Sequence, residues 1–342
     1  MKRMSKRIKN FFFILLFLLI LAFIPTPYYL YQPGTTDDLS SLVNVEDGYK
    51  EEKGNFYLTT VLSSEASNIY YLLYGLLAPH TEIKKASDVQ QDLTDQEYDD
   101  LLNFMMRDSK QNAIVSSFSE AGEDLDVDYN GIFVYGISKQ SKANGILKVG
   151  DIITEVDGTK VSERYEFINY IEKNKKAGDT VSLNFGRNGK TLEEKIEIIT
   201  LDEETNRIGL GITPEEEFIV DVARKVELIS EDIGGPSAGL MFSLEIYKQL
   251  VGKDLTKGYE IAGTGTIDHE GNIGQIGGIR HKVTSASLQG TEIFFVPKDL
   301  TELDANEKDA LSEVKNSGYD LEIVPVANLA DAIKYLENLK EK

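Results

Sequence analysis

The sequence predicts an α/β (α+β) protein with an N-terminal transmembrane helix. Three observations lead to this prediction. An uninterrupted apolar run extends from Phe11 to Ile24, a pattern of strand, turn, helix and hairpin occupies about residues 127–202, and helices alternate with strands after residue 237. In that last part we expect strands at 259–267, 292–297 and 321–326 and helices at 279–289, about 307–316 and 328–339. The length of 342 residues is enough for two or three domains.

Composition and charge exclude several classes of function. The chain has 36 Lys and Arg against 57 Asp and Glu, a net charge of −21, which argues against sequence-independent nucleic-acid binding. It contains no cysteine, so disulfides, a thiol nucleophile and cysteine-ligated metals are excluded, and three scattered histidines suggest no metal site. Gly189-Lys190-Thr191 is not a P-loop, because Asn184 stands where that motif requires glycine. We therefore expect neither ATP nor another cofactor.

The N-terminal segment predicts a membrane anchor. Residues 1–10 carry five basic and no acidic side chains, and residues 11–31 are long enough to cross a bilayer with tyrosines at the far interface. No small-x-small cleavage site follows Ala22, which favours a retained signal-anchor over a cleaved signal peptide. The positive-inside rule places residues 1–10 in the cytoplasm and the rest outside the cell. The alternative is a buried helix of a soluble domain, but the polybasic start and the fourteen apolar positions argue against it.

Residues 32–126 predict a stalk and a membrane-proximal α/β region. The polar and acidic stretch 37–53 is typical of a stalk, and Asn55–Val61 is typical of a strand. Helices are expected at about 65–78 and 94–107, and a strand at 111–118. Asp126 and Asp128 imitate an EF-hand loop, but Ile137 occupies the twelfth position, where that loop requires glutamate. We interpret these residues as an acidic loop without calcium.

The next segment has the pattern of a small sandwich. A strand from Ile132 to Ile137 is followed by the run LKVGDIITEVDG (147–158), a helix at 162–175 and a hairpin at Asn188-Gly189. This pattern resembles a PDZ domain of the bacterial, protease-associated type over residues 127–202, a small β-barrel-like sandwich with helices.

That resemblance implies peptide capture by strand addition. By position, Tyr129, Asn130, Gly131 and Ile132 would form the loop that holds the peptide end, and Ile132–Ser138 would be the docking strand. The alternative is a PDZ domain that only orients its neighbour.

The segment from Glu231 to Leu244 carries the candidate nucleophile. Pro236 suits a first helical position, and apolar residues repeat at helical spacing after it. This places Ser237 at a helix N-terminus, where free backbone N–H groups and the helix dipole would stabilise an oxyanion.

A second motif supplies a base. GGPSAG (234–239) together with GTxxxxGxIGxIGGIxxK (265–282) resembles the proteolytic domain of the Lon family over residues 203–342. The resemblance implies Ser237 as nucleophile, Lys282 as base and Thr264 as a residue that helps to orient the lysine. Gly235, Pro236 and Ala238 would form the oxyanion turn.

The proposed base and the residue before the GPSAG motif both need explanation in physical terms. A lysine base must be neutral, so its pKa has to be lowered by burial, and Ile276 and Ile279 suit such surroundings. Gly234 departs from many Lon sequences, which have an acidic residue there. Asp232 is a candidate to compensate, and its role stays open.

Gly235–Gly239 also satisfies the GxSxG pattern of esterases. That elbow requires a hydrophobic strand before the serine, followed along the chain by an acid and a histidine. The segment before Ser237 is polar, and we expect His281, beside Lys282, to point away from the serine. We therefore favour a Ser–Lys dyad over a triad and over a catalytically inactive turn.

The combined features resemble the membrane-anchored, PDZ-containing Lon-type serine proteases of Gram-positive bacteria (YlbL/SepM-like). The resemblance implies a cell-surface, ATP-independent endopeptidase that cleaves extracellular peptides or unstructured envelope proteins, including a secreted competence pheromone in quorum sensing. It also allows a homo-oligomer, because Lon-type domains commonly form rings. The alternatives are a non-catalytic PDZ scaffold at the cell surface and a serine esterase.

Overall fold

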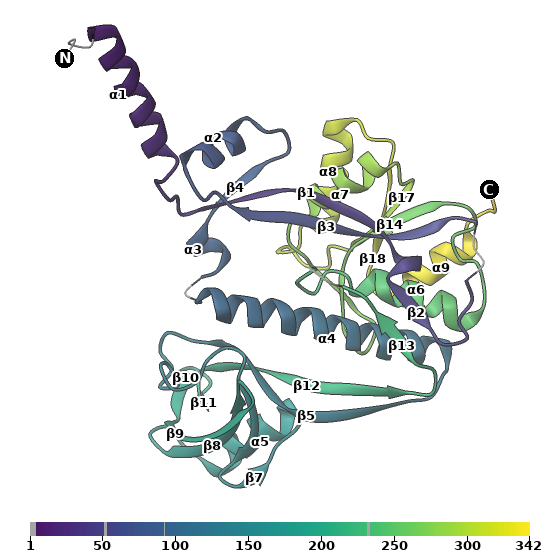
Figure 1. Ribbon diagram of the computed structural model, residues 1–342. Coiled ribbons are helices and arrows are strands. Elements are labelled where there is room, and N and C mark those ends of the chain that lie inside the picture. Colours follow the sequence, from purple (N-terminus) through teal and green to yellow (C-terminus); the bar gives the residue numbers. More distant parts are fainter. Residues whose placement is uncertain (1–4, 51–52, 92, 231–232) are drawn as a thin grey trace.

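The computed structural model describes residues 5–50, 53–91, 93–230 and 233–342. Its mixture of helices and strands confirms the predicted α/β class (Figure 1). The helices are α1 Lys6–Leu21, η1 Leu39–Ser41 (3-10), α2 Ile69–Leu77, α3 Ala86–Val89, α4 Asp95–Ala121, α5 Arg164–Asn174, α6 Gly239–Val251, α7 Ile279–Gln289, α8 Asn306–Ser317 and α9 Leu329–Asn338. The strands are β1 Tyr28–Asp38, β2 Val43–Val45, β3 Asn55–Glu65, β4 Glu82–Lys85, β5 Leu125–Ile137, β6 Ile152–Val156, β7 Thr159–Lys160, β8 Thr180–Arg187, β9 Lys190–Glu197, β10 Ile199–Asp202, β11 Arg207–Gly209, β12 Ile212–Val222, β13 Val226–Leu228, β14 Glu260–Gly263, β15 Thr266–Ile267, β16 Ile273–Gly274, β17 Ile293–Pro297 and β18 Glu322–Val326.

The first of two six-stranded sheets has the order β18-β17-β14-β3-β1-β4. Strands β3, β14, β17 and β18 run parallel, and β1 pairs antiparallel with β3 and β4. Side chains alternate between its faces, so Phe294 lies in a core with residues of α7 and α8, whereas Phe295 lies in a core with residues of α6 and α9. The helices predicted after residue 278 and the strands predicted at 292–297 and 321–326 are confirmed.

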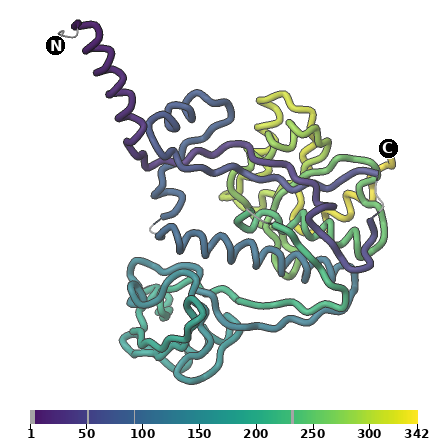
Figure 2. Tube along the Cα trace, in the orientation of Figure 1, coloured from purple at the N-terminus to yellow at the C-terminus, as the bar shows by residue number. Residues whose placement is uncertain are grey.

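The second sheet extends from a long two-stranded ribbon (Figure 2). The ribbon consists of β5 and β12, which pair from Leu125 with Val222 to Ile137 with Ile212. This sheet has the order β12-β5-β6-β8-β9, with β7 paired to β6, and α5 packs into its core through Phe167. The predicted boundary at residue 202 falls inside this unit, because β12 follows it in sequence.

Helix α4 lies between the two sheets (Figure 1). It is a single helix of 27 residues, so the strand predicted at 111–118 is wrong. A capping box between Thr94 and Glu97 starts the helix. The stretch that contains Ile114 and Val115 is helical because small side chains allow α4 to pack closely on α6. At this contact Ser116 Oγ lies 3.1 Å from Ser243 Oγ. Tertiary packing here outweighs local strand propensity.

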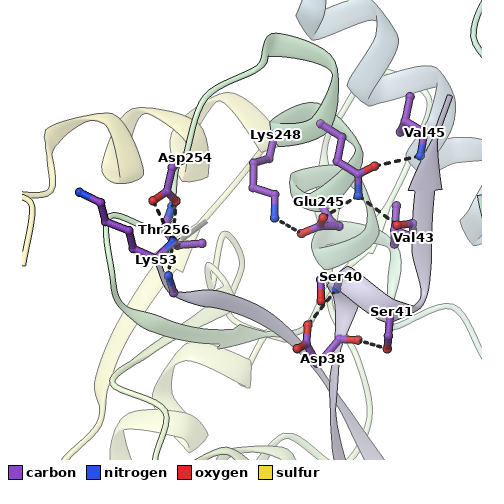
Figure 3. A network of polar contacts seen from close by, with 12 residues as sticks. Asp38, Ser40, Ser41, Val43, Val45, Lys53, Glu245, Lys248, Asp254 and Thr256 are labelled. Carbon is purple, nitrogen blue, oxygen red and sulfur yellow. Dashed lines mark hydrogen bonds and ion pairs between the residues drawn. The ribbon is translucent and has the colours of Figure 1, made fainter. Parts of the chain in front are cut away.

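The stretch 37–53 is not a stalk in its described part. Leu39, Val43 and Val45 are buried in the main core. Gln249 of α6 makes two hydrogen bonds to the backbone of this segment. Its amide nitrogen donates to Val43 O at 3.0 Å, and its amide oxygen accepts from Val45 N at 2.9 Å. Figure 3 shows this network beside the buried pair Glu245–Lys248 of α6. Burial of these three apolar side chains, together with the hydrogen bonds of Gln249, holds the polar stretch against α6.

The predicted acidic loop is also wrong. Asp126 and Asp128 lie in β5, where they pair with Asp221 and Ile219 of β12. Alternation along a two-stranded ribbon accounts for this pattern, because every second side chain faces solvent.

The predicted membrane segment is divided between two elements. Residues 6–21 form α1, whereas Tyr28, Tyr29 and Tyr31, expected at the membrane interface, lie in β1. In the part of the chain that the structure describes, no helix combines the length and the apolar character needed to cross a bilayer.

Candidate active site

Ser237 lies on a turn that leads into α6. The helix begins at Gly239, so Pro236 is not its first residue, contrary to the prediction, and Ser237 precedes the first helical residue by two positions. The turn requires glycine, because Gly235 has φ +88°. A Cβ at Gly239 would lie only 2.7 Å from Ile267 Cγ2, so glycine also allows α6 to approach β15. These glycines position the serine at the edge of the main core.

Lys282 reaches the serine from α7. Its Nζ lies 2.9 Å from Ser237 Oγ and donates to the backbone oxygen of Thr59 in β3 at 2.6 Å. The lysine is 4% exposed, and this burial lowers its pKa to about 7. Ile279 is buried and Ile276 partly buried on the neighbouring core, as expected for apolar surroundings. The structure thus brings together the two residues predicted to carry the chemistry.

Thr264 is close to the pair, but its contact differs from the prediction. Its hydroxyl donates to the backbone oxygen of Ser237 at 3.0 Å, and Gly265 N donates to the same oxygen at 3.1 Å. Lys282 donates its second hydrogen bond to the carbonyl oxygen of Thr59, a residue that was not predicted as part of the site. A backbone carbonyl leaves no signature in residue identity, so no sequence signal pointed to Thr59.

The oxyanion turn differs from the prediction as well. The N–H of Gly235 donates to Leu102 O at 3.3 Å and Pro236 has no N–H, so neither supplies a free donor. The N–H groups of Ser237 and Ala238 have no acceptor among the described residues. Ser237 and Ala238 are therefore the two candidate donors for an oxyanion. Glu231 and Asp232 lie outside the described residues.

The pair opens into a cleft of about 830 Å³. One wall consists of β1 residues, including Gly34 and Asp37, and another of Thr60 and Val61 from β3. An extended peptide fits a cleft bounded by strands, because backbone groups and alternating side chains are both presented to it.

The histidines do not form a triad with Ser237 in this structure. His281 faces away from the cleft, with its Nε2 3.5 Å from Glu82 Oε2, and burial lowers its pKa. His269 lines a different cleft, beside Pro236. The position that an esterase histidine would occupy is taken by Lys282.

The predicted PDZ loop is not a loop. Tyr129, Asn130, Gly131 and Ile132 lie in the middle of β5, where Tyr129 pairs with Phe218 and Ile132 with Glu216. Ile132 is fully buried, and the proposed docking strand has β12 on one side and β6 on the other. Strand addition needs a free edge, so this placement of the groove is wrong.

The edge strand of this sheet is β12. Among the described strands, β12 pairs only with β5, and Pro214 within it is typical of an edge. The turn before β12 contains Gly211 at φ +70°, and Glu216 accepts from the N-terminal N–H of α5 at Arg164 at 3.1 Å. Gly209 and Gly211, on either side of Leu210, are the sequence signal from which this edge strand could have been predicted.

A cleft of about 590 Å³ joins this edge to the catalytic turn. Arg164 of α5 and Glu216 of β12 line it on one side, and Pro236 and His269 line it on the other. A peptide bound along β12 would therefore extend toward Pro236, the residue next to Ser237.

Comparison with known families identifies two domains. The model of the PDZ domain matches residues 117–198, and the model of the Lon protease (S16) C-terminal proteolytic domain matches residues 170–338. The chain therefore combines a PDZ domain with a Lon-type proteolytic domain.

Curated relatives agree with this division. The Lon protease of Vibrio parahaemolyticus is 26% identical over 208 residues, covering 60% of this chain and 24% of that protein. The Lon protease of Azospirillum brasilense is 29% identical, covering 44% and 18%. The serine protease Do-like HtrA of Lactobacillus helveticus is 41% identical over 70 residues, covering 20% and 17%. The chain thus spans less than a quarter of each of these three relatives.

Among solved structures, the PDZ domain of an SdrC-like protein from Listeria monocytogenes is 36% identical. The match covers 26% of this chain and 92% of that one, with a TM-score of 0.25.

Proposed function

We propose that this chain, which carries a PDZ domain and a Lon-type proteolytic domain, is an ATP-independent serine endopeptidase with a Ser237–Lys282 dyad. The observation that carries the proposal is the 2.9 Å contact between Ser237 Oγ and a buried Lys282 whose pKa burial lowers to about 7. A lysine with that pKa is largely neutral in mildly alkaline solution and can accept the serine proton.

The reaction follows from the positions of these groups. Ser237 Oγ attacks the scissile carbonyl carbon as its proton passes to Lys282 Nζ, and the N–H groups of Ser237 and Ala238 bind the resulting oxyanion. Lys282 then gives the proton to the leaving amine, and an ester to Ser237 remains. A water molecule loses a proton to Lys282 as it attacks this ester. Collapse of the second oxyanion breaks the bond to Ser237 Oγ, which takes the proton back from Lys282, so that both residues return to their starting state. Thr59 holds the lysine in place through its carbonyl.

The substrates we propose are extracellular peptides or unstructured envelope proteins, with a secreted competence pheromone as one candidate. An extended chain is the substrate that fits the strand-bounded cleft beside Ser237. Residues 6–21, with their apolar side chains exposed and a basic start, support anchoring in the cell membrane with the catalytic domain outside.

The test uses intact cells and peptides that do not cross membranes. We expect cells with the wild-type protein to cut a mixed peptide library supplied in the medium, and cells with Ser237→Ala to leave it intact. Nitrophenyl esters of short acyl groups are offered in parallel and should be poorer substrates than the peptides.

Each other outcome points to a different reading. Cleavage by lysates but not by intact cells would place the catalytic domain inside the cell. Turnover of esters without peptides would favour an esterase, and no turnover of either by the purified full-length chain would favour a non-catalytic PDZ scaffold.

We also propose that the PDZ domain supplies substrate along β12. A peptide added antiparallel to β12 would place its end near Gly211, and its upstream residues would pass Glu216 and Pro236 toward Ser237. Holding one end of the substrate in this way raises the local concentration of its scissile bond.

Blocking this edge should therefore weaken binding of long substrates. Because the chain has no cysteine, Glu216→Cys can be labelled with fluorescein maleimide at one site. Labelling should raise KM for a substrate of about twenty residues by roughly tenfold, on the scale of tethering gains, and should leave hexapeptide cleavage unchanged.

The matched control is labelled Asp221→Cys, an exposed position on the same strand, which should leave both substrates unaffected. Equal loss on long and short substrates would mean that the PDZ domain supports the protease structurally and does not receive its substrate.

A further inference from the structure

Helix α2 is apolar, yet it is almost entirely exposed. Its sequence is IYYLLYGLL, and in the structure only Gly75 is buried. Leu77 is 86% exposed and Leu76 is 66% exposed. The large exposed side chains are Tyr70, Tyr71, Leu73, Tyr74, Leu76 and Leu77. A contiguous apolar surface of this kind marks a contact with a protein or a membrane.

This exposure is built into the fold. Asn68 Oδ1 caps the helix by accepting from Tyr70 N at 3.0 Å and Tyr71 N at 3.2 Å. Gly75 rests on Leu30 of β1 so closely that a Cβ there would lie 2.4 Å from Leu30 Cδ2. The helix therefore docks through its glycine and presents its large side chains outward.

The apolar surface continues into α1. The hydroxyl of Tyr70 donates to the backbone oxygen of Leu18 at 2.5 Å, and Figure 1 shows α2 beside the end of α1 that enters the fold. No residue of α1 is buried. The exposed side chains of α1 and α2 thus form adjoining surfaces.

Charge identifies the occupant of these surfaces. Although the chain has 57 acidic residues, none lies in residues 1–36 or 66–81, which contain α1 and α2. Strand β4 follows with Glu82, Ile83, Lys84 and Lys85, and the carboxylate of Glu82 lies 3.5 Å from Lys84 Nζ, so the strand adds one net positive charge. Bacterial membranes are commonly anionic and repel acidic surfaces, and tyrosines concentrate at the level of the lipid headgroups. This combination fits a lipid bilayer better than a second copy of this acidic chain.

We propose that α2 inserts its tyrosine and leucine side chains into the interface of the membrane, next to α1. The inference rests on the membrane anchoring proposed above. It adds a position for the active site, because β1 runs from Leu30, under α2, to Gly34 in the catalytic cleft. Four residues of strand span about 14 Å, so the cleft opens close to the membrane surface. The substrates are then chains that lie at or emerge from the bilayer.

The absence of tryptophan from the chain allows a direct test. Three full-length single-tryptophan variants are reconstituted into vesicles of phosphatidylglycerol and phosphatidylethanolamine, with plain or brominated acyl chains. The variants are Leu76→Trp in α2, Phe17→Trp in α1, and the control Tyr165→Trp, which is 72% exposed and lies in α5. Helix α4 lies between α5 and α2 (Figure 1). We expect brominated lipid to quench the emission of the first two and to spare the control.

The pattern of quenching separates the two proposals. Quenching of Phe17→Trp without Leu76→Trp would overturn the interfacial position of α2 and leave the anchor in place. Loss of quenching in both, with peptide cleavage intact, would overturn anchoring and α2 together while leaving the peptidase untouched.

A second copy of the chain is the remaining occupant to test. Leu76→Trp emission that shifts to the blue with rising protein concentration, and that brominated lipid does not quench, would show that α2 contacts another protomer and would overturn the proposal. As a second variant, Leu76→Glu combined with Leu77→Glu changes only exposed side chains and should weaken the quenching of Tyr71→Trp by brominated lipid.

Discussion

Ser237→Ala and Lys282→Met should each reduce kcat/KM for peptide cleavage by at least about 10⁴-fold. The reason is that nucleophile and base act as one unit: without Lys282 the serine proton has no acceptor at 2.9 Å, and without Ser237 the lysine has nothing to activate. The double variant should be no slower than either single variant. Steady-state kinetics on one peptide substrate measures all three.

Two controls make this result decisive. His281→Ala should keep peptide cleavage, because His281 faces Glu82 and not the cleft. Lys282→Met should remain folded at pH 8. The folded-state pKa of the lysine lies below its unfolded value, so the chain takes up a proton on unfolding between about pH 7 and 10.4. This proton uptake favours the unfolded state and lowers the free energy of unfolding. Replacing Lys282 by Met removes the amine and therefore removes this loss of stability. A double variant much slower than both single variants would refute the dyad.

The activity should rise with pH around neutrality. Lys282 is the base only when neutral, and burial lowers its pKa to about 7. Below that pKa the protonated fraction grows, so kcat/KM should fall tenfold per pH unit and be about a hundredfold below its plateau at pH 5. Above pH 8 the profile should be flat, whereas a solvent-exposed lysine would activate only near pH 10.4. A profile of kcat/KM from pH 5 to 10 measures this.

A neighbouring carboxyl group has to be separated from this titration. Asp108 of α4 lines the cleft beside Pro236, and burial raises its pKa to about 6. In Asp108→Asn the inflection near pH 7 should persist. If it disappeared, Asp108 and not Lys282 would govern the profile. Circular dichroism over the same pH range distinguishes loss of activity from unfolding.

Local sequence predicted most of the second half of the fold. Helix α7 and strands β17 and β18 fall within one residue of the expected bounds, because strong apolar runs are separated by glycine-rich turns. Helix α4 differs from the prediction, because the β-branched stretch near Val115 favours a strand locally but packs as helix against α6. The segment near Val43 differs as well: its few apolar residues are spread among polar ones and predict a stalk, yet they are buried in the main core.

The sequence by itself determined which residues are the candidates for the chemistry, because Ser237 and Lys282 belong to two motifs whose residue types and glycines are readable one position at a time. Tertiary structure alone decided what surrounds them. The carbonyl of Thr59 meets Lys282 across 223 positions, and β12 becomes the edge of the PDZ sheet by pairing with β5. Local propensity does not contain such information, because a backbone oxygen is the same in every residue and strand pairing depends on the packing of distant segments.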